Sequence, residues 1–209
     1  MKLTFPFNSC EPPNKNGIAQ PYSTLVNLVN CLVIVYFLVK TTTNYAFLLI
    51  TSILCFELFH LFSHSIHIPG SIQTIVIHML SYFINISFFY AFYSYTTKIP
   101  NTIFIGYLLA LIGLDIYALL NLNIFYYVAT QSIIFISLLF YYFKWLPNFV
   151  QKSMYSIITC ISIILLLILN EKYNCKRMLK IIPKFPFHIF VEIGGIVLFY
   201  MICSTFYKL

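Results

Sequence analysis

The sequence predicts an all-α fold in which seven transmembrane helices form the bundle of a polytopic membrane protein. Of its 209 residues, 61% are hydrophobic and 8% are Asp, Glu, Lys or Arg, whereas soluble domains contain roughly 25% charged residues. The chain also contains seven apolar runs, each near the roughly 20 residues that a helix needs to cross the hydrocarbon layer. Short polar breaks separate these runs, so we expect a single transmembrane domain over residues 1–209.

Each apolar run ends where charge, polar side chains or proline interrupts it. The helices are expected at approximately 22–39, 45–63, 72–95, 102–120, 124–143, 153–169 and 185–207. The interrupting stretches are residues 40–44, 67–70, 98–100, 121–123, 144–152 and 170–184. The last break is strongly basic, and we expect it to be a loop.

Charge and the first 21 residues bear on the membrane topology. These residues lack the apolar stretch of a cleaved signal peptide, so we expect the first helix to act as a signal anchor. Seven Lys and Arg residues fall on the side of the N-terminus and five on the other, which slightly favours a cytoplasmic N-terminus. The net charge of +7 is spread over short connecting segments. It suits contact with anionic lipid headgroups, and no basic domain or helix is predicted on which nucleic acid could dock.

Four ionisable residues gather at the end of the second run. Glu57, His60, His64 and His67 are three, four and three residues apart, so they share one face of a helix. An ionisable group within the hydrocarbon layer is costly and is by default a candidate for function.

A second group lies at the start of the seventh run, where His188 and Glu192 are four residues apart. His78 lies about two turns into the third run. Because successive helices alternate in direction, these residues and the end of the second run belong to the same side of the membrane. One shared site is therefore possible.

Imidazole nitrogen and carboxylate oxygen are suitable ligands of zinc. We expect His60, His188 and Glu192 to bind Zn²⁺, leaving an open coordination position where water becomes a nucleophile near neutral pH. For His64 and His67, close to the helix end, we favour interhelical or interfacial hydrogen bonding, and that alternative stays open for the whole group.

Three separated stretches carry a resemblance to a known family. They are Asn8-Ser-Cys10-Glu11 with residues 18–28, then Phe59-His60, and finally Phe187-His188-Ile-Phe-Val-Glu192-Ile-Gly194. In order and spacing they resemble the motifs of alkaline ceramidases, seven-helix membrane hydrolases of the CREST superfamily. The resemblance implies a zinc-dependent amidase that hydrolyses the N-acyl bond of ceramide or a related sphingolipid. It also implies a membrane lipid as substrate and a membrane of the endoplasmic reticulum or Golgi type.

The resemblance implies zinc ligands at His60 and His188, with Glu192 where the family has a second His in its last motif. Two further family positions are changed. Phe56 stands where the family has a Ser that helps to hold or activate water, and the position of its Asp falls on Ser71 or near residue 76.

Because these two groups are lost, no residue is an obvious candidate for the expected general base. We assign the catalytic role to Glu57 or His78 as substitutes, because both are ionisable and are expected near the zinc ligands.

The N-terminal segment resembles the calcium site of the family. Asn8, Glu11 and Gln20 would then be ligands of Ca²⁺. Only Glu11 keeps its acid, so a weaker site is expected.

The resemblance also implies a disulfide bond between Cys10 and Cys175. Such a bond requires that face to be luminal or extracellular, and we prefer this N-terminal orientation to the one from the charge count. The other cysteines are expected to be small packing residues: Cys31, Cys55, Cys160 and Cys203.

Two alternative functions stay open. The changed Ser and Asp positions favour a degenerate, non-catalytic relative that binds or senses lipid. The other alternative is an ion or proton pathway along the helix face from Glu57 to His67. These residues, however, lie at one end of the membrane rather than crossing it.

Overall fold

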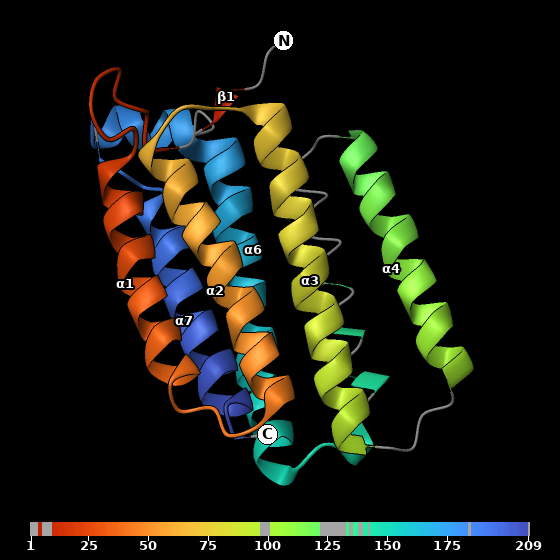
Figure 1. The fold of residues 1–209 in the computed structure, drawn as a ribbon. Helices are drawn as coiled ribbons and strands as arrows, with labels where there is room; N and C mark the ends of the chain where they lie inside the picture. The colour runs from red at the N-terminus through yellow and green to blue at the C-terminus, as the bar shows by residue number, and fades with distance from the viewer. Residues whose placement is uncertain are drawn as a thin grey trace.

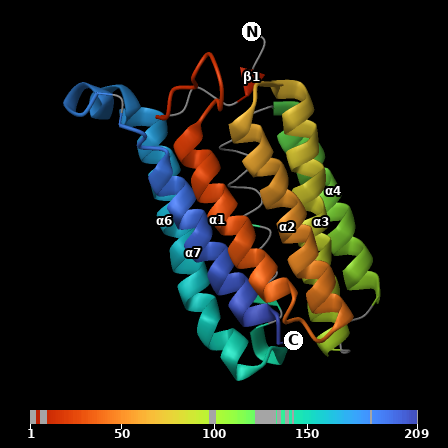
Figure 2. The same ribbon diagram turned by 60° about the vertical axis from the view of Figure 1, so that its left-hand side comes forward.

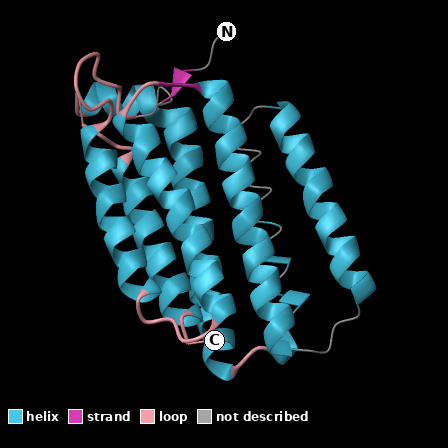
Figure 3. Cartoon of the chain, viewed as in Figure 1, coloured by secondary structure: helices cyan, strands magenta, loops and turns pink. Residues whose placement is uncertain are grey.

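The computed structural model describes residues 4–5, 10–96, 101–121, 133, 136–137, 140–141, 143–183 and 185–208. Nearly all of this described chain is helical (Figure 3). The helices are α1 (Pro21–Leu38), α2 (Asn44–Ser65), α3 (Gly70–Thr96), α4 (Asn101–Asn121), α6 (Asn148–Ile181) and α7 (Ile189–Phe206). The short elements are the strands β1 (Thr4–Phe5) and β2 (Ile68–Pro69) and the 3-10 helix η1 (Phe143–Trp145).

Within the described residues, five helices are long and apolar enough to cross a membrane, namely α1, α2, α3, α6 and α7. Large apolar side chains on their outer faces are exposed, for example Leu25 (61%) and Leu32 (62%) of α1. The all-α fold is therefore confirmed, and these five helices are compatible with an integral membrane protein. The count of seven spans stays a prediction, because most of the fifth expected helix, 124–143, lies outside the described residues.

The bounds of α1 to α4 agree with the expected helices to within about two residues, as the polar breaks predicted. The end of α6 differs from the expected end of the sixth helix at residue 169. The expected loop over 170–184 is wrong, because the helix continues unbroken from Asn148 to Ile181 over 34 residues.

The physical reason is that charge ends a membrane span without ending a helix. Glu, Lys, Arg, Met and Leu favour helix, and neither Gly nor Pro interrupts α6 before Pro183. At 1.5 Å per residue, 34 residues extend about 51 Å, well beyond a hydrocarbon layer of roughly 30 Å. The end of α6 turns away from the axis of the bundle (Figure 2).

The helices pack with α1 against α2 and α7, α3 against α2, and α6 against α7 (Figure 1). The apolar core lies in the half of the bundle nearer the C-terminus, where it includes Phe37, Leu49, Phe88, Met154 and Phe206. The opposite half holds buried polar side chains at the start of α1, the end of α2 and the start of α7. The candidate site residues belong to this polar half.

Gly194 allows α7 to approach α6 closely. A Cβ atom at this position would lie 2.8 Å from Cγ1 of Ile164 on α6. Small residues at such contacts let membrane helices pack closely. The contact lies half a turn beyond Glu192 and sets the distance of this part of α7 from α6.

The N-terminal segment covers the polar end of the bundle. Its strand β1 pairs antiparallel with β2, in the connection between α2 and α3. Further along, the N–H of Ala19 donates to the carbonyl of Ser65 (3.0 Å) and that of Gln20 to the carbonyl of His64 (2.9 Å). These bonds fix the segment to the last turn of α2.

A disulfide bond between Cys10 and Cys175 joins the N-terminal segment to the end of α6. The pairing implied by the resemblance is thus confirmed. The other cysteines are free: Cys31, Cys55, Cys160 and Cys203. Cys31 and Cys203 are buried, as expected of packing residues, whereas Cys55 is exposed.

Cysteine alkylation tests this pairing. Denatured protein treated with iodoacetamide is expected to gain four labels without reductant and six after reduction, measured as intact mass. A Cys175→Ser variant is expected to gain five labels without reductant, since its Cys10 is then free. Six labels on the unreduced wild-type protein would contradict the pairing.

Candidate metal centre

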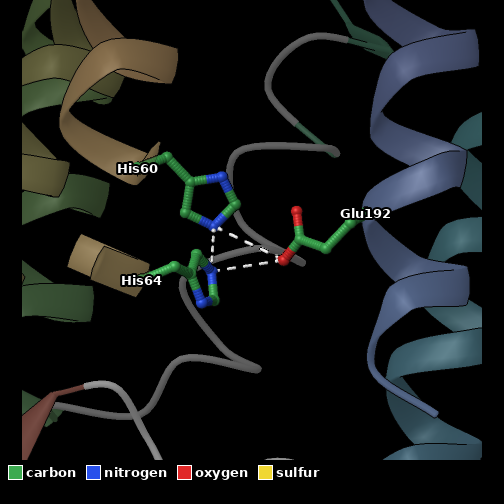
Figure 4. Close-up of side chains that lie close together, drawn as sticks. All are labelled: His60, His64 and Glu192. Atoms are coloured by element: carbon green, nitrogen blue, oxygen red, sulfur yellow. Dashed lines mark hydrogen bonds and ion pairs between the residues drawn. The ribbon is translucent and has the colours of Figure 1, made fainter. Parts of the chain in front are cut away.

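Two helices bring three possible metal ligands together in the polar half of the bundle. His60 and His64 extend from α2, and Glu192 extends toward them from α7 (Figure 4). One ligand atom from each residue lies within 4.8 Å of the others. Both His64 and Glu192 are buried, and His60 is one quarter exposed (25%).

The distances in this group are those of atoms around one ion. Nε2 of His64 lies 3.2 Å from Oε1 of Glu192, and Nε2 of His60 lies 3.8 Å from the same oxygen. The two Nε2 atoms are 3.0 Å apart. Ligands at about 2.1 Å from a tetrahedral zinc ion are roughly 3.4 Å from one another.

The hydrogen bonds of His64 define its tautomer. Nε2 of Gln20 donates to the backbone carbonyl of Glu11 (2.5 Å), so Oε1 of Gln20 faces Nδ1 of His64 at 2.5 Å. Because an amide oxygen only accepts, Nδ1 of His64 carries the hydrogen and donates it. Nε2 of a neutral His64 is then left with a lone pair.

This lone pair faces other acceptors. Nε2 of His64 points at Nε2 of His60 and at the carboxylate of Glu192, as Figure 4 shows. The nitrogen lone pairs and the carboxylate charge repel one another unless a proton or a cation lies among these atoms. The donor set therefore fits a divalent metal ion that accepts nitrogen and oxygen ligands, as zinc does.

His188, an expected ligand, lies next to this group but in a different arrangement. It is the N-cap of α7, and its Nε2 lies 2.8 Å from Oε1 of Glu192. Its Nδ1 lies 2.8 Å and 3.0 Å from the two carboxylate oxygens of Glu171. Burial lowers the pKa of His188, but the hydrogen bonds to Glu171 and Glu192 outweigh burial and raise the pKa to about 10.

His64 therefore takes the place that the sequence analysis gave to His188 in the group of three. Its position near the end of α2 favoured a hydrogen-bonding role at the interface. The structure buries it because Gln20 and the N-terminal segment lie over this end of the helix. The spacing of residues within α2 does not predict that the N-terminal segment lies over His64.

Neither expected catalytic residue belongs to the group of three. Oε2 of Glu57 is 3.6 Å from Nδ1 of His60, on the side of the ring away from Glu192. This placement suits a group that orients His60 rather than one that activates water. His78 is buried on α3 and does not belong to the group of three. Phe56 lies beside His60, with ring centroids 6.1 Å apart.

The residues expected to bind calcium have other partners. The Glu11 carboxylate accepts hydrogen bonds from the N–H of Ser23 (3.1 Å) and from its hydroxyl, in the first turn of α1. Oε1 of Gln20 faces His64, and Asn8 lies outside the described residues. A calcium ion takes six to eight oxygen ligands, so the calcium site stays a prediction.

Glu171 is a site residue that the sequence analysis missed. It lies in the basic stretch after the sixth apolar run, where carboxylates are ordinary surface groups. Its pairing with His188 depends on the continuation of α6 and on the return of the chain into α7. The scarcity of acids, five in the whole chain, was the one available signal.

Comparison with known proteins adds no relative. No protein-family model, no curated protein and no solved structure matches the chain. The resemblance to alkaline ceramidases therefore rests on the three motifs alone, and membership in that family is a proposal.

Two substitutions, one in the last turn of α2 and one just beyond it, test the ligand set. His64→Ala is expected to weaken zinc binding by more than about 100-fold, because loss of a ligand should exceed the 10- to 100-fold effect of an outer group. His67→Ala is the matched control, since His67 is exposed and contacts the carbonyl of Asn14. Competition with a chromogenic chelator measures both. Equal affinities of the two variants would remove His64 from the ligand set.

Proposed function

We propose that the protein is a zinc-dependent membrane amidase that hydrolyses the N-acyl bond of ceramide or a related sphingolipid. The observation that carries this proposal is the convergence of His60, His64 and Glu192 within 4.8 Å. Two histidines one helical turn apart and a glutamate from another segment form the ligand set of zinc hydrolases that keep a fourth position open. The choice of a ceramide-like substrate rests on the resemblance.

Each residue has a distinct part in the proposed reaction. His60, His64 and Glu192 hold the ion, while Glu57 orients the ring of His60 through Nδ1. Zinc, when bound, would polarise the amide carbonyl and activate water. His188 is the group that can move a proton at Nε2, which faces the centre while Nδ1 is held by Glu171.

An open pocket near the same end of the bundle supports a lipid substrate. Its volume is about 430 Å³, and it is lined by Tyr22, Ile182, Pro183, Phe185, Pro186 and Ile189. Ligand pockets commonly measure 300–1,000 Å³ and are mostly apolar. Ile189 directly follows His188, so the pocket lies beside the start of α7 and is suited to an acyl chain.

The proposed orientation places the N-terminus in the lumen of the endoplasmic reticulum or Golgi, or outside the cell. The Cys10–Cys175 disulfide supports this orientation, because disulfides persist in oxidising compartments.

Hydrolysis of a fluorescent ceramide by purified protein in mixed micelles tests the amidase proposal. His60→Ala is expected to lower the rate by on the order of 1,000-fold, because both the carbonyl and the water depend on the ion. Removal of metal from the wild-type protein with a chelator should lower the rate to a similar extent. Added zinc should restore the rate of the wild-type protein but not that of His60→Ala. His67→Ala is the control and should keep its rate. Equal rates for wild type and His60→Ala would contradict the proposal.

A second candidate is a non-catalytic relative that binds or senses lipid. Phe56 favours it, because this side chain places an apolar ring 6.1 Å from that of His60 where the family has a hydroxyl. The variant Glu192→His separates the two candidates. If the wild-type protein binds ceramide without hydrolysing it and Glu192→His hydrolyses it, the binding function holds.

A further inference from the structure

Glu171 joins three parts of the chain that are far apart in sequence. Its carboxylate accepts hydrogen bonds from Nδ1 of His188, at 2.8 and 3.0 Å, and from the backbone N–H of Cys10, at 2.7 Å. Both side chains of the Glu171–His188 pair are largely buried, with 14% and 16% of their surfaces exposed. A carboxylate in this position has few water molecules to compete for it.

The bond to Nδ1 decides which nitrogen of His188 faces the centre. An imidazole ring has two nitrogens, and rotation of a free ring would exchange their positions or turn both away. With Nδ1 held by Glu171, Nε2 lies 2.8 Å from Oε1 of Glu192. His188 is thus an outer partner of the proposed metal ligand Glu192, and outer partners of ligands typically affect metal affinity by 10- to 100-fold.

Glu171 is itself held by the disulfide. Cys175 lies four residues after Glu171, one turn along α6, and is bonded to Cys10. The covalent bond therefore keeps the Cys10 N–H beside the Glu171 carboxylate. The position of the carboxylate is fixed from both the helix and the N-terminal segment.

We propose that Glu171 is a positioning residue, which fixes the His188 ring so that Nε2 faces Glu192 and the metal centre. The proposal rests on the metal centre described under the proposed function for its effect on zinc. In this proposal the Glu171 carboxylate acts only by holding His188, and it contacts neither the ion nor the substrate.

A double-mutant cycle on zinc affinity tests this action. Glu171→Gln is expected to lower the affinity by up to about 10-fold in the wild-type background, since it disturbs but does not remove His188, an outer partner of Glu192. In the His188→Ala background the same substitution should change it by less than about twofold, because the group through which Glu171 acts is gone. Glu171→Asp, which keeps the charge, should recover part of the affinity. Lys176→Gln, at an exposed position on the same helix, is the control for a changed charge.

Equal losses in both backgrounds would overturn the proposal, since they would mean that Glu171 acts on the centre by another route. Absence of any loss in Glu171→Gln would overturn it as well.

A metal-free measurement separates this proposal from the proposed function. If the wild-type protein binds no zinc, the proposed function fails, and the same four proteins are compared by thermal unfolding in detergent without metal. Glu171→Gln should then lower the midpoint only where His188 is present. A similar shift in both backgrounds would show that Glu171 does not hold His188.

Discussion

The buried carboxylate of Glu192 is the constraint around which the polar half of the bundle is arranged. A carboxylate between apolar helices is costly unless positive or hydrogen-bonding groups surround it. Three imidazole rings surround it, with Nε2 atoms 2.8, 3.2 and 3.8 Å from Oε1. Because Nε2 of a neutral His64 carries a lone pair, its attraction to the carboxylate requires a cation or a proton among these atoms. Gln20 and Glu171 accept hydrogen bonds from Nδ1 of His64 and of His188, and Glu57 lies 3.6 Å from Nδ1 of His60. These contacts link α7 to α2, α6 and the N-terminal segment.

This arrangement explains why the two halves of the molecule differ. The half near the C-terminus is packed by aliphatic and aromatic side chains, such as Phe88 and Phe206 with ring centroids 5.2 Å apart. Such packing requires no particular partner for any polar atom. The other half depends on directed hydrogen bonds between distant segments, so the disulfide and the strand pair β1–β2 are found at that end.

The sequence predicted those features that depend on local composition. Polar breaks placed the ends of α1 to α4, and the alternating direction of successive helices brought His60 and Glu192 into one candidate site. The length of α6 could not be predicted in the same way, because hydropathy locates the membrane and not the helix. The roles of His64 and Glu171 depend on contacts with Gln20 and Cys10 of the N-terminal segment. The tertiary fold determines these contacts.

The length of α6 also bears on its end. Its 34 residues would extend about 51 Å along a straight helix, compared with a hydrocarbon layer of roughly 30 Å, and the end of the helix turns away from the axis of the bundle (Figure 2). In a membrane, a helix of this length cannot lie wholly within the hydrocarbon layer. Its basic end is therefore suited to contact with anionic lipid headgroups.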